Sequence, residues 1–239
     1  MMKPLFVTLL LPLMLILSGA AGAGVLVGAT RIIYPADQQE VLIPVKNNDR
    51  ETSHLVQSWV SDIHDQGKPD FIVTPPLVKL AAQQEMHLHI IYSGTAAALP
   101  QDRESVFWAN IKSIAATPEA LKEKSKLQIA AKTRIKLFYR PASLIHQEAQ
   151  EAYKKLIFTQ QQNRLRVTNP TPFYITLQDL AVGGIQVTPP ENSSPALSMM
   201  IAPFSEQTYS VPGNAHGAVT WSAITDYGSR TKPLTHLFS

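Results

Sequence analysis

The sequence contains no cysteine, so it cannot belong to the small folds that depend on disulfide bonds for stability. It also has little excess charge. Its 239 residues include 21 lysines and arginines and 18 aspartates and glutamates, which gives a formal charge of +3. A nucleic-acid-binding domain carries a stronger basic surface, so the composition argues against that class. The chain therefore depends on a packed core for its stability.

Long apolar runs are absent as well, except at the N-terminus. Lys3 precedes the apolar segment 5–17, and the small residues Ala21, Gly22 and Ala23 follow it. This order is typical of a secretory signal peptide that is cleaved after Ala23. The run is shorter than the roughly 20 residues that a bilayer core requires, which makes a retained anchor the weaker interpretation. We expect an exported chain without a membrane span, and an exported protein without cysteine suits a bacterial periplasm.

Short runs of alternating apolar and polar residues follow from Val25 to about Arg140, with proline, glycine, asparagine and aspartate between them. Valine, isoleucine and aromatic residues dominate the runs, as in β-strands. Seven strands at this spacing predict an antiparallel sandwich. The runs are VLVGATRIIYP, EVLIPVKN, HLVQSWVSD, FIVTPPLVKL, MHLHIIYSG, ESVFWANIKSI and LQIAAKTRIKLFYR.

The pattern changes after Pro141. The segment SLIHQEAQEAYKKLIF has the one apolar spacing that could be helical, and strand signals with proline-rich turns then resume. They predict a second, smaller all-β domain. The expected organisation is a signal peptide over residues 1–23, a first domain over residues 24–143 and a second domain over residues 144–239.

The last run of the first domain alternates for longer than the five or six residues of an ordinary strand. Along it, Leu127, Ile129 and Ala131 share a face with Ile135, whereas Lys136 lies on the opposite face. One domain core need not cover so long an apolar face. Its first part either fills the core of its own domain or serves another molecule, and the periodicity leaves both alternatives open.

Several blocks of the sequence, taken in order, resemble the periplasmic pilus-assembly chaperones of the chaperone/usher pathway. They cover nearly the whole chain after residue 23, and the short segment before LQIA resembles the short-loop branch. The resemblance implies an all-β fold of two immunoglobulin-like β-sandwich domains, arranged in an L with an interdomain cleft. The blocks are GVLVGATRIIYP, FIVTPPLVKL, RESVFWANIKSI, RIKLFYRP, NPTPFYITL, MIAPFSEQ and ITDYG.

The resemblance also implies a binding site for the C-terminus of a pilus subunit. Arg31 of ATRIIYP and Lys136 of RIKLFYRP match the pair that anchors the subunit's carboxylate, and two cations suit that group. Leu127, Ile129 and Ala131 match the residues that enter the subunit's groove when the chaperone donates a strand. Ala131 is smaller than the bulky residue often found there.

A second set of residues implied by the resemblance is structural. Glu104, Arg140 and Asp226 match an interdomain ionic network in which one cation is held between two carboxylates. Burying such charges is costly unless all are paired, so we expect the network to fix the angle between the domains. The alternative that these carboxylates act as a catalytic acid and base has no substrate cleft to support it.

The expected function is that of a non-enzymatic chaperone that binds pilus or fimbrial subunits and delivers them to an outer-membrane usher. No cofactor, metal or nucleic acid is implied, and two copies of the chain could pair through the donor strand when no subunit is bound. One rival interpretation is an exported adhesin or structural pilus subunit. The other is a zinc enzyme that uses His87 and His89, although a zinc site needs three or four ligands.

Overall fold

The computed structural model describes residues 24–67, 69–95, 98–117, 127–190, 194–213 and 215–238. The expected signal peptide, residues 1–23, lies outside them. Within the described ranges, no helix is long and apolar enough to cross a membrane.

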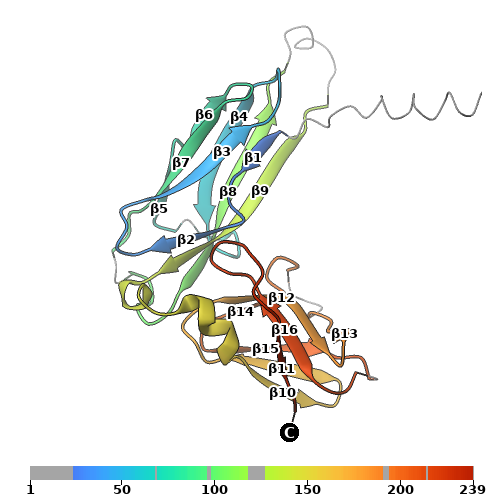
Figure 1. The fold of residues 1–239 in the computed structure, drawn as a ribbon. Coiled ribbons are helices and arrows are strands. Elements are labelled where there is room, and N and C mark those ends of the chain that lie inside the picture. The colour runs from blue at the N-terminus through green and yellow to red at the C-terminus, as the bar shows by residue number, and fades with distance from the viewer. Residues whose placement is uncertain are drawn as a thin grey trace, which may run out of the picture.

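The first half of the described chain forms a β-sandwich whose two sheets have the strand orders β1-β3-β7-β5 and β2-β9-β8-β4-β6 (Figure 1). The alternating sequence pattern explains which side chains enter the core, since Ile43 and Val45 of one strand and Leu88 and Ile90 of its neighbour are all buried. The strands are β1 (Val25–Val27), β2 (Arg31–Pro35), β3 (Val41–Asn47), β4 (His54–Ser61), β5 (Phe71–Thr74), β6 (Leu77–Leu80), β7 (Glu85–Tyr92), β8 (Ser105–Ala115) and β9 (Ala130–Arg140).

Two of the seven expected runs are each divided into two strands that belong to different sheets. The first is divided between β1 and β2, and the fourth between β5 and β6. Pro75 and Pro76 separate β5 from β6, because proline has no N–H for a continuous ladder. Beside β1, a Cβ at Gly28 would lie 2.6 Å from Pro44 Cγ, so the chain passes too close to β3 for a larger residue.

The long alternating run begins later as a strand than the sequence predicted. β9 starts at Ala130, so Leu127 and Ile129 precede it. β9 pairs with β8 along nearly its whole length, from Ala130 to Tyr139, but with β2 only from Lys136 to Arg140. Among the described residues, the edge of β9 from Ala130 to Ile135 therefore has a strand on one side only (Figure 1).

The second half of the described chain forms a smaller sandwich. Its sheets have the orders β10-β11-β15 and β13-β12-β16-β17, and β14 pairs with β12. The strands are β10 (Ile157–Gln161), β11 (Arg164–Asn169), β12 (Ile175–Val182), β13 (Ile185–Gln186), β14 (Met200–Ile201), β15 (Ser205–Ser210), β16 (Val219–Ala223) and β17 (Leu234–His236).

The segment with helical spacing does not form an α-helix. It contains two 3₁₀ turns, η3 (Ala142–Leu144) and η4 (Ala149–Lys155), and its last residues begin β10. Packing decides the outcome, since Phe158 of β10 lies with its ring centre 4.4 Å from that of Trp221. The Trp221 Nε1–H group also donates to Tyr153 O at 3.0 Å, which fastens η4 to the sheet.

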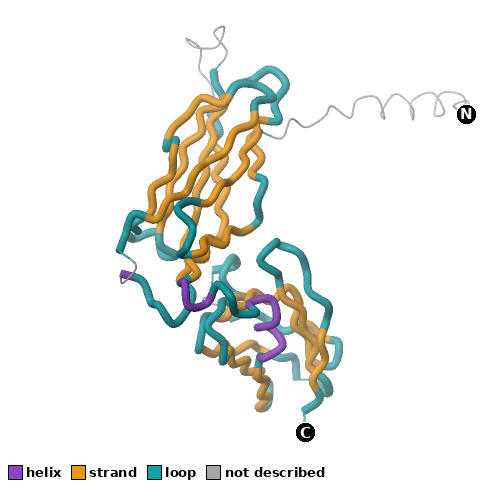
Figure 2. Tube along the Cα trace, turned by 60° about the vertical axis from the view of Figure 1, so that its left-hand side comes forward, coloured by secondary structure: helices purple, strands orange, loops and turns teal. Residues whose placement is uncertain are grey.

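Each sandwich encloses its own hydrophobic core. The first includes Tyr34, Leu137 and Tyr139, and the second includes Leu165, Leu180 and Tyr209. Figures 1 and 2 show the two sandwiches set at an angle to each other, with η3 and η4 beside their junction. This arrangement agrees with the expected pair of immunoglobulin-like domains.

Candidate functional site

Arg31 and Lys136, which are far apart in the sequence, are adjacent in the structure. Arg31 is the first residue of β2, Lys136 lies within β9, and the two are register partners in the parallel ladder. The residues on either side of the lysine, Ile135 and Leu137, are buried in the first core. Lys136 therefore points to the opposite face, as the alternation predicted.

Arg31 is also in contact with the second domain. Its Nη1 atom donates a hydrogen bond to Ile224 O at 3.0 Å. The guanidinium carbon lies 5.3 Å from the ring centre of Phe138, within the range of a cation–π contact. Arg31 thus lines a cleft that residues of both domains form.

Burial disfavours the positive charge of both residues. It lowers the pKa of the Lys136 ammonium to about 8, and the neighbouring Arg31 guanidinium contributes to the decrease. Burial also lowers the pKa of Arg31, although Asp226 and Glu104 oppose this effect. No carboxylate of the described residues forms an ion pair with Lys136. A bound anion would supply the missing negative charge, because a carboxylate forms charge-assisted bonds with both groups.

The structure excludes one of the two alternatives for the first part of the long run. The side chains of Leu127 and Ile129 are 87% and 74% exposed, and Ala131 is exposed too. Burial on this face begins only at Ile135. Leu127 and Ile129 therefore do not fill the core of their own domain. They lie beside the unpaired edge of β9, where backbone N–H and C=O groups are available to another strand.

Glu104, Arg140 and Asp226 are brought together between the domains. Arg140 Nε donates to Glu104 Oε1 at 2.9 Å, and its Nη1 and Nη2 atoms donate to Asp226 Oδ2 and Oδ1 at 2.9 and 3.2 Å. The second oxygen of Glu104 accepts a bond from Tyr174 N–H at 2.8 Å. One cation therefore connects a carboxylate of the first domain to a carboxylate of the second.

The network lies out of water on the Glu104 side. Only 2% of that side chain is exposed, against 25% for Asp226. Burial raises the pKa of the Glu104 carboxyl, and the bonds from Arg140 and Tyr174 N–H oppose the increase. Burial alone would lower the pKa of Arg140, but its bonds to Asp226 and Glu104 raise it. The guanidinium is thus held firmly in its charged form.

Two further interdomain contacts had no signal in the sequence. The guanidinium carbon of Arg103 lies 5.0 Å from the ring centre of Phe204. Gly228, at φ +78°, approaches Thr30 so closely that a Cβ would collide with Thr30 Oγ1. Both contacts join residues that are distant in the chain, which explains why local patterns do not indicate them.

The histidine pair lies on the surface of the first domain, and one of the two histidines has a carboxylate partner. His89 Nδ1 lies 2.9 Å from Glu40 Oε2 on the surface of the first domain. Within the described part of the chain, no group of three or more histidine, cysteine, aspartate or glutamate side chains could hold a metal ion. His87 is exposed and His89 is partly exposed, as an amphipathic strand predicts.

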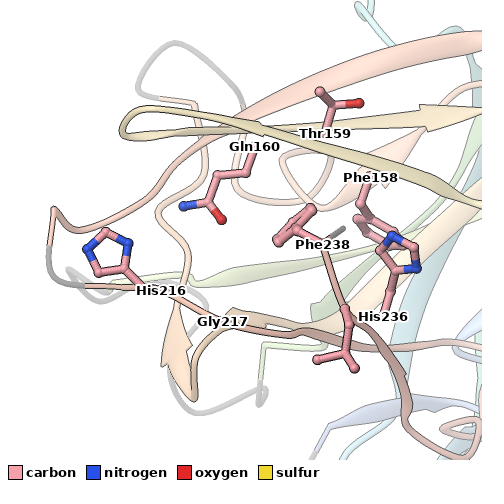
Figure 3. Close-up of a pocket in the computed structure, with 8 residues that line it drawn as sticks. Phe158, Thr159, Gln160, His216, Gly217, His236 and Phe238 are labelled. Carbon is pink, nitrogen blue, oxygen red and sulfur yellow. The ribbon is translucent and has the colours of Figure 1, made fainter.

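A pocket of about 550 Å³ lies in the second domain (Figure 3) and shares no lining residue with the cleft. It is formed by β10, the loop at His216 and the end of the described chain. Figure 3 shows His216 and His236 at opposite ends of it, so the two imidazoles do not form one site. None of its lining residues belongs to the candidate site.

Two sequence families match the chain, one for each half. Residues 24–145 match the family described as pili and flagellar-assembly chaperone, PapD N-terminal domain. Residues 151–234 match the family described as pili assembly chaperone PapD, C-terminal domain. Together the two matches include every residue of the candidate site.

Known proteins with these domains are similar over most of their length. The chaperone protein FimC of Escherichia coli O6:H1 is 39% identical over 221 residues, which cover 92% of this chain and 87% of FimC. A crystal structure of the E. coli chaperone DraB has a TM-score of 0.75 and 34% identity, and covers 89% of this chain and 98% of DraB. A structure of the Salmonella enterica SafA pilin in complex with the SafB chaperone has a TM-score of 0.76 and 31% identity. The match covers 92% of this chain and 99% of the matched chain in that structure.

Proposed function

The chain belongs to the PapD family of pili-assembly chaperones, and from this membership we propose that it captures a fimbrial subunit by strand donation. The subunit's C-terminal carboxylate binds between Arg31 and Lys136. The segment from Leu127 to Ala131 completes the subunit's own sandwich. Capture involves no enzymatic step, since the fimbrial chaperones to which the chain is homologous are not enzymes.

The observation that carries this proposal is the half-buried cation pair at the end of an unpaired strand edge. Lys136 keeps no carboxylate partner among the described residues, and its pKa is lowered to about 8 by burial. A carboxylate at this place relieves that unfavourable burial and accepts bonds from Arg31 and Lys136 together. A chain terminus is the one main-chain group that brings such a charge.

The position of β2 gives the direction of the bound strand. β2 runs parallel to β9 from Arg31 onward and pairs with it from Lys136 onward. A subunit strand whose terminal carboxylate lies at Arg31 must extend along β9 toward Ala130. It therefore runs parallel to β9 and uses the N–H and C=O groups of the unpaired edge.

The exposed side chains beside this edge supply the apolar part of the interaction. Leu127 and Ile129 are separated by one residue, so in an extended chain they project on the same side and enter the same groove. Burying two such side chains contributes about 1.5–3 kcal/mol each. Ala131, next in the row, contributes less because it is smaller.

In this proposal, the ionic network fixes the position of the cleft relative to the donor edge of β9. Arg140 connects Glu104 to Asp226, and Arg31 contacts the second domain through Ile224 O. The proposed role of the network is to fix the angle between the domains, so that the cleft and the donor edge meet the same subunit.

We propose that the first domain spans residues 24–143 and the second spans residues 144–239. Residues 1–23 would be removed on export to the periplasm.

In this proposal, an outer-membrane usher receives the bound subunit. There the donated segment is exchanged for a strand of a neighbouring subunit that complements the groove better. When no subunit is present, the same exposed segment could join two copies of the chain. An adhesin or a structural pilus subunit is disfavoured by the family membership.

The test is co-expression in the periplasm with fimbrial subunits encoded beside the gene, followed by purification of the complex. Wild type should yield a stable one-to-one complex, and the double variant Arg31→Ala, Lys136→Ala should yield none. The matched control is the double variant Lys132→Ala, Arg134→Ala, which removes two cations from the exposed part of β9. Undiminished capture by the first double variant, with a normal circular dichroism spectrum, would contradict the anchor.

The donor segment is tested separately with Leu127→Asp and Ile129→Asp. Both side chains are exposed, so these changes should leave the fold and its melting temperature intact. Each should lose the ability to protect a subunit from proteolysis. If either variant still protects, strand donation is not the mechanism.

A further inference from the structure

Tyr227 is exposed to an unusual degree for an aromatic side chain. Its exposed fraction is 83%, and among the large apolar side chains described only Leu127 is more exposed. Leaving a ring of this size in water forgoes the stabilisation that burial would provide. Leu127, the side chain closest to it in exposure, already belongs to the proposed subunit-binding surface.

The turn that carries Tyr227 is fixed on both sides. Thr225 N–H donates to Ser229 O at 2.8 Å, and Gly228 N–H donates to Thr225 O at 2.9 Å. Asp226, which precedes the tyrosine, is held by two bonds from Arg140. The exposure therefore does not come from a loose loop, and the turn that carries the ring is held at a defined place.

That place is beside the proposed carboxylate anchor. Ile224, three residues before Tyr227, accepts a bond from Arg31 Nη1 through its carbonyl oxygen. Gly228, the next residue, approaches Thr30 closely. The residues on either side of the tyrosine thus contact residues 30 and 31 of the first domain. Residues 224–226, which precede it, line the cleft.

We propose that Tyr227 is a specificity-determining residue that packs against the side chain of the last or penultimate residue of the bound subunit. The inference rests on the proposed function, because the subunit's carboxylate at Arg31 brings its last residues to this turn. A phenol ring offers an apolar face and one hydroxyl group. It therefore favours a subunit that ends in an aromatic or aliphatic side chain over one that ends in small polar residues.

The probes are two synthetic peptides of about twelve residues with alternating valine and threonine. They carry a free C-terminal carboxylate and differ only at the penultimate residue, which is tyrosine or serine. Each is also made with an amidated C-terminus. Binding to the mature chain is measured by fluorescence anisotropy at pH 7.

Wild type should bind the tyrosine peptide about three- to tenfold more tightly than the serine peptide, as expected for one aromatic contact. Tyr227→Ala should lose this preference and bind the serine peptide as wild type does. Leu237→Ala is the control, since Leu237 is 74% exposed elsewhere on the same domain, and it should keep the preference.

The inference is overturned if Tyr227→Ala retains the preference, or if wild type shows none. The comparison of free and amidated peptides tests the proposed function independently. Equal binding of the two forms would reject the carboxylate anchor and, with it, the inference that depends on it. A preference for the free acid without discrimination at the penultimate residue would reject the role of Tyr227 alone.

Discussion

Arg31 and Lys136 are register partners on parallel strands, so two half-buried cations lie side by side where β2 begins. Burial disfavours the charged form of both residues and lowers the pKa of each. The protein thus maintains an unfavourable charge arrangement in the free state. In the proposed function, the carboxylate of a bound subunit offsets this cost.

Removing the lysine charge should therefore stabilise the protein while it abolishes capture. We expect Lys136→Met to raise the melting temperature at pH 7 by about 2–4 °C, the change that ~1 kcal/mol gives in a protein of this size. Differential scanning calorimetry of wild type and variant measures it. Lys132→Met is the control, since Lys132 is exposed and should shift the melting temperature little. A lower melting temperature for Lys136→Met would show that the charge supports the fold.

The same pKa predicts how this stability difference depends on pH. The lysine titrates at about 8 in the folded protein and at its ordinary value of 10.5 when unfolded. Between these values the unfolded state binds more protons, so the wild type gains stability as the pH rises. The advantage of Lys136→Met should be constant below pH 8 and shrink from pH 8 to 10.5. Denaturant titrations at several pH values measure it, and an advantage that grows in this window would contradict the lowered pKa.

The affinity for a carboxylate-ended peptide should fall as the pH rises above about 8, whereas the stability of the free wild type rises. A bound carboxylate raises the pKa of Lys136, so binding takes up a proton once the pH exceeds about 8. Affinity should be constant below pH 8 and then fall, by up to about tenfold per pH unit. Lys136→Arg keeps its charge over this range and should remove the decline. A decline of equal size in that variant would assign the titration to another group.

Arg140 should matter more for stability than either of its partners. Arg140→Met leaves the carboxylate of Glu104 buried without a cation, which costs about 3–5 kcal/mol. The double variant Arg140→Met, Glu104→Gln should recover much of this loss, because it removes both charges. Chemical denaturation of Arg140→Met, Glu104→Gln and the double variant measures the three changes in the free energy of unfolding. A double variant as unstable as the sum of the single changes would mean that the buried charge is not the cause.

Gly228 should tolerate no side chain, because two effects coincide there. An alanine would collide with Thr30 Oγ1, and its φ of +78° is unfavourable for any residue with a Cβ. Gly184→Ala is a matched control, with φ +82° and nothing within 4 Å of the added Cβ. Calorimetry should show a larger loss for Gly228→Ala, and Thr30→Ala should narrow the difference. Equal losses at the two glycines would show that backbone strain alone is responsible.

Much of the architecture could be predicted because it is encoded locally. Alternation along Val41–Asn47 and Glu85–Tyr92 gives the strands, and the buried flanks of Lys136 give its outward direction. The alternation did not predict that β1 and β2 are two strands, because this division depends on the close passage of Gly28 past Pro44. The spacing of residues 143–158 indicated a possible α-helix, which the structure does not contain there. Packing against Trp221 determines the conformation of that segment.

The site shows the same distinction between local and distant information. Arg31, Lys136, Glu104, Arg140 and Asp226 were assigned through the resemblance, and the structure brings each set into contact. The Arg103–Phe204 contact and the exposed turn at Tyr227 were missed. Each depends on how the two domains meet, which no periodicity within one strand can express.

The pairing of β2 with β9 limits where another strand can bind along the free edge. From Lys136 onward the pairing positions of β9 are already filled by β2, so an incoming strand can slide no further than Arg31. The register of the subunit strand on β9 would then be set by the position of the subunit's C-terminus and not by its side chains. In the proposed complex, subunits of different sequence would therefore share one register on β9, because each is aligned by its C-terminal residue.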